Sequence, residues 1–320
     1  MKKMTKYILC LLLCAFCLPV NAQAKELIPV GQVVGLELRD NTVTVAAIDD
    51  TLGAGCKEAG IAPGDRILSI DGITIRCAED IRQALARSDG RVSVTILRGD
   101  KEQTVSVSPQ ITTSGPKLGL YLRQGVTGVG TVTWYDPDTG KFGTLGHGVA
   151  NNGQLLSLAS GHAYRARVTT VRKGKSGDPG QLMGSIESRT PIGELTANTA
   201  QGVFGVTDSG WEGQALPVAD EDEIRTGKAV IRSTVEGSTV REYSVEILKI
   251  YPLERSSGRN LLLRVTDPQL LNLTGGIVQG MSGSPIIQNG KLVGAVTHVL
   301  VNDPTTGYGI FIENMLDAAA

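Results

Sequence analysis

Short apolar runs with alternating polar positions fill the first third of the chain after residue 32. Six of them are β-rich, namely VVGLEL, TVTVAAI, RILSI, ITI, RVSVTIL and TVSVS, and one helical stretch, AEDIRQALARS (78–88), lies late among them. Alternation in RVSVTIL and TVSVS is typical of half-buried strands, and LRGDKEQ between them supplies a hairpin turn. The pattern predicts a small β-barrel capped by one or two helices.

A second and longer region of strand-like runs extends from residue 119 to residue 320. Its runs alternate with glycine-rich turns: GVGTVTWY, AYRARVTTV, KAVIRSTV, REYSVEILKIY, NLLLRVTD, GKLVGAVTHVLV and GYGIFIE. WYDPDTGKFGTLGHG predicts a hairpin with DPDTG as its turn, and no long amphipathic helix precedes the final residues. We therefore predict a β-barrel or a double β-barrel here.

A segment without periodicity separates the two regions. SPQITTSGPKLG is rich in turn-forming residues, and we predict a linker over residues 110–118. The first region would then be one small domain over residues 27–109. A chain of 320 residues with 41% hydrophobic and 20% charged residues is long enough for two such domains.

Composition supports a mainly β protein and narrows the classes of partner. The chain has 40 glycines against four phenylalanines and two tryptophans, and glycine is costly inside helices. The formal net charge is -1, and no run of Lys or Arg in the body is longer than two residues. Nucleic acid and anionic membrane surfaces are therefore not expected as main partners.

The first residues have the layout of an export signal. MKKMTK is basic, YILCLLLCAFCLPV is an apolar run, and VNAQAK supplies small residues suited to cleavage after Ala22 or Ala24. The apolar run is shorter than the roughly 20 residues of a stable transmembrane helix. We predict a signal peptide over residues 1–24, with an uncleaved N-terminal anchor as the alternative, and no other contact with the membrane.

Cysteine usage gives no sign of a metal site. Three of the five cysteines lie in the apolar run, which leaves Cys56 and Cys77. A single disulfide between these two is conceivable outside the cytoplasm. Neither has metal-ligand spacing, and there is no Cys/His cluster, so we expect no metal and no cofactor.

AGIAPGDRILSIDG (59–72) is the most diagnostic segment of the first region. It resembles the PDZ domains of bacterial proteases, in which AGL-x-x-GD-x-I-x-x-I-x-G recurs. In that family a glycine-containing loop presents backbone N–H groups to the terminal carboxylate of a peptide, and the next strand pairs with the peptide. The matching loop here would be Val34, Gly35 and Leu36; the alternative is that these residues form an ordinary first strand.

GGIVQGMSGSPIIQNGKLVGAV contains a candidate nucleophile turn. Residues 280–285 match the G-x-S-G-x-P string of chymotrypsin-like serine proteases, with Ser282 as the nucleophile. The backbone N–H groups of Gly280 and Ser282 would form the oxyanion hole. Met281 stands where many secreted relatives of that class have an aspartate that pairs with a new N-terminus, so we do not expect that route of activation.

The general base must be one of three histidines. His147 follows a strand and is flanked by glycines, so its ring can protrude into a cleft and face a serine on the other half of the domain. A surface-turn histidine with an ordinary pKa is the alternative. His162 has the pattern of a strand-start or turn residue. His298 lies in an apolar strand, as a core residue or as part of a specificity pocket.

The blocks GVGTVTWYDPDTGKFGTLGHGV, GKSGDPGQLMG and GMSGSPIIQNGKLVGAVTHVLVNDPTTGYGIFIENM, preceded by a PDZ module and an export signal, resemble the SpoIVB peptidases of endospore-forming bacteria. The resemblance implies a chymotrypsin-like double β-barrel in which Ser282 and His147 are catalytic. It also makes Asp267, in LLLRVTDPQLL, the matching catalytic aspartate. By spacing alone Asp267 is unusual, because the triad aspartate of chymotrypsin-like enzymes lies midway between histidine and serine.

The resemblance further implies a function in sporulation. Such peptidases are exported into the space between the forespore and mother-cell membranes, where they cleave the extracytoplasmic part of a membrane protein that restrains an intramembrane protease. A late sigma factor is thereby activated, and the peptidases also cleave themselves near the N-terminus. Two alternatives remain open: a non-catalytic scaffold led by the PDZ domain, and a general extracytoplasmic quality-control protease, which would place PDZ modules after the protease.

Overall fold

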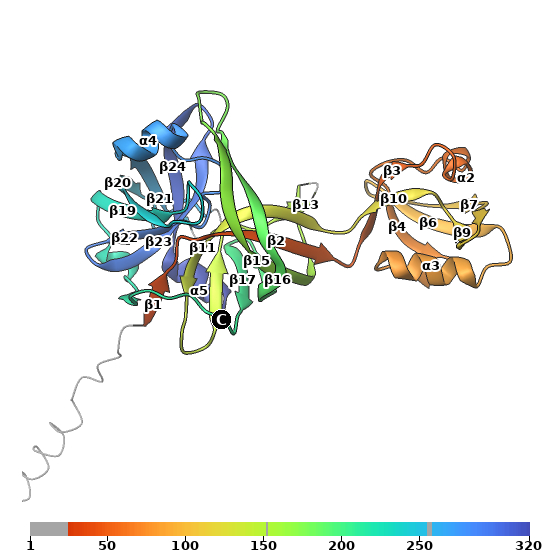
Figure 1. Ribbon diagram of the computed structural model, residues 1–320, viewed down its shortest axis with the longest axis horizontal. Helices are drawn as coiled ribbons and strands as arrows, with labels where there is room; N and C mark the ends of the chain where they lie inside the picture. Colours follow the sequence, from red (N-terminus) through yellow and green to blue (C-terminus); the bar gives the residue numbers. More distant parts are fainter. Residues whose placement is uncertain (1–24, 152, 255–257) are drawn as a thin grey trace, which may run out of the picture.

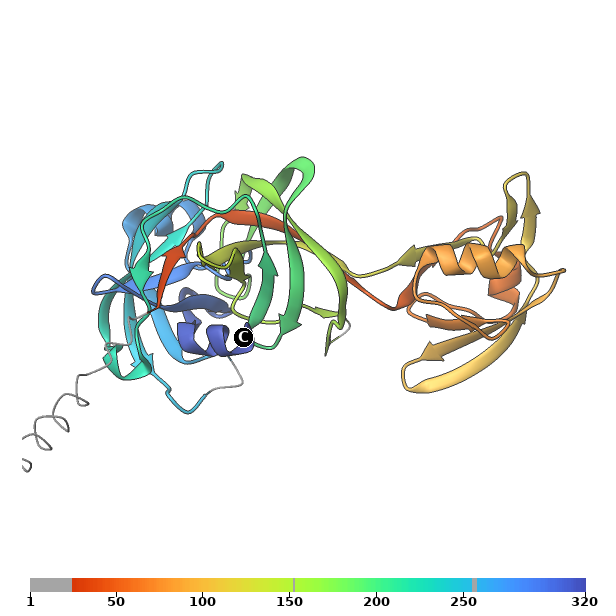
Figure 2. The same cartoon turned by 90° about the horizontal axis from the view of Figure 1, so that it is seen from below.

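The computed structural model describes residues 25–151, 153–254 and 258–320 (Figure 1). The predicted export signal over residues 1–24 lies outside these residues. Among the helices of the described part, none combines the length and the apolar character needed to cross a membrane. The described chain forms two β-barrels that pack together and a smaller domain at one end of the molecule (Figures 1 and 2).

The first barrel is a closed ring of six antiparallel strands. They follow the order β2 (Val33–Asp40), β11 (Val126–Tyr135), β12 (Lys141–Thr144), β17 (Gly202–Val206), β16 (Gln181–Thr199) and β15 (Leu158–Arg172), which pairs back with β2. Two short strands, β1 (Glu26–Pro29) and β18 (Leu216–Pro217), extend the sheet beyond β11. Side chains of period two, such as Val34, Leu36 and Leu38 of β2, fill the interior.

The second barrel closes with six strands of its own. Their order is β19 (Gly227–Ser233), β20 (Arg241–Ile250), β21 (Leu261–Val265), β24 (Asp303–Phe311), β23 (Lys291–Leu300) and β22 (Pro285–Gln288). Alternation is clear in β21, where Leu261, Leu263 and Val265 point inward. The remaining elements around this barrel are short: η1 (Glu221–Glu223), α4 (Pro268–Thr274) and α5 (Ile312–Ala318).

The two barrels share a small apolar core. Trp134 and Phe204 of the first barrel pack with Ala295 and Ile310 of the second, and Met315 of α5 belongs to the same cluster. Because each barrel contributes side chains to this core, the barrels are held as one unit around the line where they meet. The predicted mainly β fold with a double β-barrel is confirmed.

The small domain is a six-stranded sheet with two helices. Its strands run β10 (Leu120–Arg123), β3 (Val43–Ile48), β4 (Arg66–Ile70), β6 (Val92–Arg98) and β7 (Lys101–Val107), with β5 (Ile73–Thr74) beside β4. The helices are α2 (Ala54–Glu58) and α3 (Ala78–Ala86). The buried carboxylate of Asp65 accepts the N–H of Ala62 and bonds to Arg98, which explains the aspartate of the AGIAPGD segment.

The small domain is inserted into the first barrel, and the predicted boundaries at 27–109, 110–118 and 119–320 are wrong. Strands β1 and β2 precede the insertion and belong to the barrel, while β10 lies after the predicted linker and pairs with β3. The linker itself contains a hairpin of β8 (Gln110–Thr112) and β9 (Gly115–Lys117), and Leu118 lies in the core of the small domain. An alternating strand pattern cannot reveal which sheet a strand joins, because pairing is decided by partners distant in sequence.

The two cysteines of the small domain are both free thiols. Cys56 is buried in α2, and Cys77 precedes α3 at the N-cap position. Burial raises the pKa of the Cys56 thiol to about 11, which makes it an apolar packing residue rather than a nucleophile. The conceivable disulfide between them is not formed.

Candidate active site

The nucleophile turn lies in the second barrel and is fixed by hydrogen bonds from the first. Thr131 of β11 donates its N–H to the Ser282 carbonyl at 3.0 Å and its hydroxyl to the Gly280 carbonyl at 2.9 Å. Met281 points the other way and is fully buried in the core of the second barrel. The turn is therefore pinned on both sides of the serine, by an apolar anchor and by the neighbouring barrel.

Two glycines let the barrels approach closely at this turn. A Cβ on Gly283 would lie 2.0 Å from the Thr131 carbonyl oxygen, and a Cβ on Gly146 would lie 2.9 Å from the methyl group of Thr297. Both glycines have positive φ, and so does Leu145 before Gly146, which is uncommon for a residue with a branched side chain. This left-handed pair of residues at the end of β12 turns His147 toward the second barrel.

His147 is half-buried, and a hydrogen bond to the backbone determines which of its ring nitrogens carries the proton. Its Nδ1 lies 3.0 Å from the Gly148 carbonyl oxygen. Because a carbonyl oxygen can only accept, Nδ1 carries the hydrogen and Nε2 keeps its lone pair. Burial lowers the pKa of His147, and the bond to Gly148 opposes this shift without cancelling it. The ring is therefore a neutral imidazole, as a general base must be.

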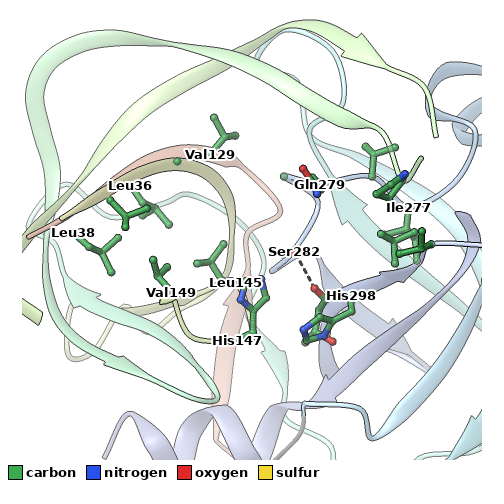
Figure 3. Close-up of a pocket in the computed structure, with 18 residues that line it drawn as sticks. Leu36, Leu38, Val129, Leu145, His147, Val149, Ile277, Gln279, Ser282 and His298 are labelled. Carbon is green, nitrogen blue, oxygen red and sulfur yellow. Dashed lines mark hydrogen bonds between the residues drawn. The ribbon is translucent and has the colours of Figure 1, made fainter. Parts of the chain in front are cut away.

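Ser282, His147 and His298 line one cavity of about 470 Å³ between the barrels (Figure 3). The Ser282 hydroxyl donates to the Thr297 carbonyl at 2.8 Å, and no hydrogen bond joins it to His147 within the described chain. Rotation about the Cα–Cβ bond of the serine would release this bond. Loose nucleophile–base contacts are common in enzymes without substrate, so the geometry is compatible with catalysis.

His298 lies beside His147, with 5.3 Å between the ring centroids. Burial, followed by the neighbouring His147 and Arg259, lowers the pKa of His298 to about 4. Its Nδ1 is buried and has no hydrogen-bond partner among the described residues. His298 is thus a neutral side chain that lines the cavity, which agrees with the prediction that it could be part of a pocket. His162 lies on β15 opposite Glu37 and does not line this cavity.

The two amides expected to hold an oxyanion are both available. Gly280 has φ of +97°, a conformation that glycine adopts without strain. Within the described residues, neither the Gly280 N–H nor the Ser282 N–H donates to another protein group. Both residues line the cavity, so a carbonyl oxygen bound there could accept from them.

Asp267, the third residue expected from the resemblance, is not brought to His147. It is the N-cap of α4, where its carboxylate accepts the N–H groups of Gln269 and Leu270 at 2.9 and 3.0 Å. The other oxygen accepts from Ser244 N–H at 3.3 Å. An aspartate followed by proline at the first helical position is a typical helix start, and that local role accounts for the carboxylate.

The predicted peptide loop of the PDZ domain is also misplaced. Val34, Gly35 and Leu36 lie in β2, paired with β11 and β15 inside the first barrel. The alternative interpretation of these residues, an ordinary strand, is the correct one. They are apolar on alternate positions around a glycine, a pattern that many barrel strands share.

A different segment of the small domain carries a groove. A cavity of about 340 Å³ lies between α3 and the strand β10, lined by Ile81 and Leu85 of the helix and by Leu118, Gly119 and Leu120 of the chain entering the strand. Gly119 has φ of +64° and lies against the backbone of Leu52. In the sequence, this segment is the string KLGLYL, a glycine that leads into an apolar strand. Its first residues fall in the segment for which we predicted a linker.

Comparison with known proteins agrees with this architecture. The family model described as SpoIVB peptidase S55 matches residues 115–316, and a PDZ-domain model matches residues 56–98. The chain belongs to the SpoIVB peptidase family. Both the family expected from the sequence and the order of its two modules are confirmed, and the chain contains a PDZ domain.

Curated relatives of this SpoIVB-family chain carry other names. One from Rhizobium meliloti, named a putative zinc metalloprotease, is 24% identical over 256 residues, which are 76% of this chain and 60% of that protein. One of the same description from Mesorhizobium japonicum is 32% identical over 80 residues, 25% of this chain and 22% of that protein. The chain thus spans less than two thirds of these relatives. In the part of the chain described here, no group of three or more His, Cys, Asp or Glu side chains could hold a metal ion.

Two solved structures are similar to parts of the chain. The PDZ domain of the SdrC-like protein from Listeria monocytogenes is 23% identical with a TM-score of 0.22, covering 26% of this chain and 87% of that one. The inactive form of the Rv3671c protease is 15% identical with a TM-score of 0.35, covering 60% of this chain and 82% of that one. The fold assignment of this chain rests on its own strand pairing.

Proposed function

We propose that this peptidase is a serine endopeptidase, with Ser282 as nucleophile and His147 as general base. The observation that carries the proposal is the convergence of both side chains on one cavity, with the proton of His147 placed on Nδ1 and its Nε2 free. The two available N–H groups of Gly280 and Ser282 lie on the same cavity. A nucleophile, a neutral base and oxyanion donors are the three parts that acyl transfer requires.

The proposed reaction needs no further group. Ser282 Oγ attacks the substrate carbonyl carbon while its proton passes to Nε2 of His147, and the resulting oxyanion is held by the two amides. His147 then gives the proton to the leaving nitrogen as the C–N bond breaks, leaving an acyl-serine. Water attacks this ester with His147 again acting as the base, which releases the second product and restores the serine.

For the biological role, we propose a regulatory protease of sporulation that is exported and cleaves the extracytoplasmic part of a membrane-bound regulator of an intramembrane protease, as well as itself in trans. Activation of a late sigma factor would follow. Membership of the SpoIVB family supports this role. The groove beside α3 would bind a segment of the substrate, because an exposed strand next to a helix accepts an extended peptide and raises the local substrate concentration.

A purified chain starting at residue 25 tests the chemistry. A fluorophosphonate is expected to label the wild-type protein and not Ser282→Ala, and His147→Ala should lower the labelling rate steeply. Self-cleavage, followed by gel electrophoresis, should be lost with Ser282→Ala. Absence of serine-dependent labelling in folded protein would contradict the serine mechanism and favour a non-catalytic scaffold.

A further inference from the structure

The cavity around Ser282 contains no charged side chain among the described residues that line it. Its polar groups are the two histidines, Ser282, Gln279 and Thr297, and both histidines are neutral for the reasons given above. Most of the remaining lining is aliphatic. Charged residues make up 20% of the whole chain, so a lining without any charged side chain differs clearly from the average composition.

The aliphatic side chains form two walls, one on each barrel (Figure 3). Ile277, Val278 and Val299 belong to the second barrel, close in sequence to the oxyanion amides and to Thr297. Leu36, Leu38 and Val149 belong to the first barrel, on the side of His147. Ile277 and Val278 are themselves anchored in the core of the second barrel, so their wall is rigid.

The proposed reaction determines which substrate residue lies against each wall of the cavity. The scissile carbonyl must point at the Gly280 and Ser282 amides, which places the residue that precedes the scissile bond against the second-barrel wall. The leaving nitrogen must receive its proton from His147, which places the residue that follows the bond toward the first-barrel wall. Both substrate side chains therefore enter uncharged, aliphatic surroundings.

We propose that the substrate segment of this peptidase is aliphatic on both sides of the scissile bond, with a residue such as Leu, Ile or Val preceding it. A Lys, Arg, Asp or Glu side chain there would lose its hydration, and no side chain that lines the cavity carries a charge to pair with it. Arg259, whose charge acts on His298, is exposed and does not line the cavity. This inference rests on the proposed serine mechanism, and it names the class of peptide that the mechanism acts upon.

Internally quenched peptides that differ only at the residue before the bond test the preference in the full protein. We expect cleavage of a Leu or Val peptide to exceed that of the Lys, Arg and Asp peptides by about 100-fold or more in kcat/KM, the scale of the cost of leaving a buried polar or charged group without a partner. A preference for Lys, Arg or Asp would overturn the proposal.

A variant of the wall provides the reciprocal test. Val299→Asp places a carboxylate on the second-barrel wall, and it should shift the relative kcat/KM from the Leu peptide toward the Lys peptide. Val240→Asp is the matched control, since Val240 is 36% exposed and does not line the cavity; it should keep the wild-type preference. Unchanged selectivity in a folded Val299→Asp protein would contradict the assignment of the wall.

Fluorophosphonate labelling separates this inference from the proposed mechanism. Labelling that depends on Ser282, together with a charged preference, would refute only the substrate class. Loss of serine-dependent labelling would refute the mechanism on which the substrate class depends.

A second observation concerns what orients His147 in place of Asp267. The Gly148 carbonyl that accepts from Nδ1 and the Val149 N–H are the two ends of a single peptide group. Asn198, at the end of β16, accepts from Val149 N–H at 2.8 Å and donates to the Val149 and Leu156 carbonyls at 2.8 and 2.7 Å. Because a peptide group is planar, holding its N–H also fixes the direction of its C=O.

The structure assigns Asn198 as the positioning residue of His147, acting through the Gly148–Val149 peptide group. The three bonds of Asn198 are all to backbone groups, and they determine which side-chain atom is oxygen and which is nitrogen. Removal of the side chain would free the loop that carries the histidine. A neutral peptide carbonyl would then do for this base what a carboxylate does in other serine proteases.

The rate of fluorophosphonate labelling of the full protein tests the assignment. Asn198→Ala should slow labelling by up to roughly 100-fold, the loss that a displaced catalytic group can cause. Asn198→Asp keeps an acceptor for Val149 N–H and adds a negative charge near His147, so the acid limb of its pH–rate profile should move to higher pH. Thr199→Ala, which removes only turn contacts to Gly202 and Gln201, is the control.

The pH profile distinguishes positioning from mere stabilisation. A folded Asn198→Ala protein that labels at the wild-type rate, with a lower melting temperature as its only change, would overturn the assignment. So would an Asn198→Asp protein whose acid limb coincides with that of the wild type.

Discussion

At the scale of single residues, the two neighbouring histidines decide the electrostatics of the cleft. Both have lowered pKa values because burial disfavours their charged forms, and each would also repel the other if protonated. A neutral His147 is ready to accept the serine proton, whereas a neutral His298 can pack against it without charge repulsion. The two histidines therefore affect both the chemistry of the cleft and the stability of the protein at acidic pH.

The stability of the fold should fall as the pH is lowered from about 6.5 to about 4. An unfolded histidine has a pKa of about 6.5, whereas the folded-state pKa of His298 is about 4. Between these values the unfolded chain binds more protons, so stability rises with pH across the window. Because the His298 ring is only partly buried, solvent screening keeps the change below about 3 kcal/mol. His298→Gln should flatten the dependence of the unfolding free energy on pH. An identical slope in the wild type and in this variant would contradict the prediction.

Asp267 provides a second prediction at this scale. As a helix cap it should be replaceable by Asn, which caps equally well, so Asp267→Asn is expected to keep the wild-type labelling rate. Asp267→Ala should lower the unfolding free energy by about 1 kcal/mol. A triad aspartate would behave differently, since its conversion to Asn lowers kcat by about 10⁴-fold in a well-studied serine protease. Labelling rates and denaturant unfolding distinguish the two roles.

At the scale of elements, the active site depends on how closely two turns approach. The turn after β12 carries His147, the turn before β22 carries Ser282, and each has a glycine pressed against the opposite barrel. The strands on either side hold these turns through the shared core at Trp134 and Ala295. Neither barrel alone contains both proposed catalytic side chains, so their packing creates the candidate site.

Gly283→Ala tests this close approach. Its Cβ would lie 2.0 Å from the backbone oxygen of Thr131, and its φ of +95° is strained for alanine. We expect a melting temperature lowered by several degrees and a large loss of labelling. Gly290→Ala is the matched control, because Gly290 also has positive φ, but a Cβ at this position would meet no atom of the described residues within 4 Å. Equal effects of the two substitutions would show that backbone strain alone, and not contact, limits position 283.

At the scale of the whole molecule, the PDZ domain leaves and re-enters the first barrel through adjacent strands (Figure 2). Its own core contains no side chain of either barrel among the described residues. Strands β2 and β11, which border the insertion, also bear residues that line the cavity around Ser282, such as Leu36 and Val129. A peptide bound to the PDZ domain is thus connected to the cleft by the two strands that line it.

Occupying the PDZ groove should affect protein substrates and not the chemistry. Ala78 is exposed and lines the groove, so Ala78→Trp should fill it and reduce cleavage of a protein substrate by about 10-fold or more, as expected when local enrichment is lost. Labelling by a fluorophosphonate should be unchanged. Ala86→Trp, exposed on the same helix outside the groove, is the control. Equal cleavage by both variants would exclude the groove as a substrate site.

Local patterns in the sequence determined much of this protein. Alternating apolar positions predicted the mainly β architecture, GMSGSP placed Ser282 on a tight turn, and the glycines around His147 indicated a protruding base. AGIAPGD identified the PDZ module through a turn whose aspartate is buried. Each of these signals is contained within a few consecutive residues, where backbone conformation and side-chain chemistry are set locally.

Only the tertiary structure decided which strands share a sheet and which side chains meet. It moved Val34, Gly35 and Leu36 into the barrel, gave β10 to the PDZ domain, and separated Asp267 from His147 while bringing Asn198 to the loop behind it. The physical reason is that strand pairing and cleft geometry depend on contacts between residues distant in sequence. An alternating pattern is equally satisfied by several such partners.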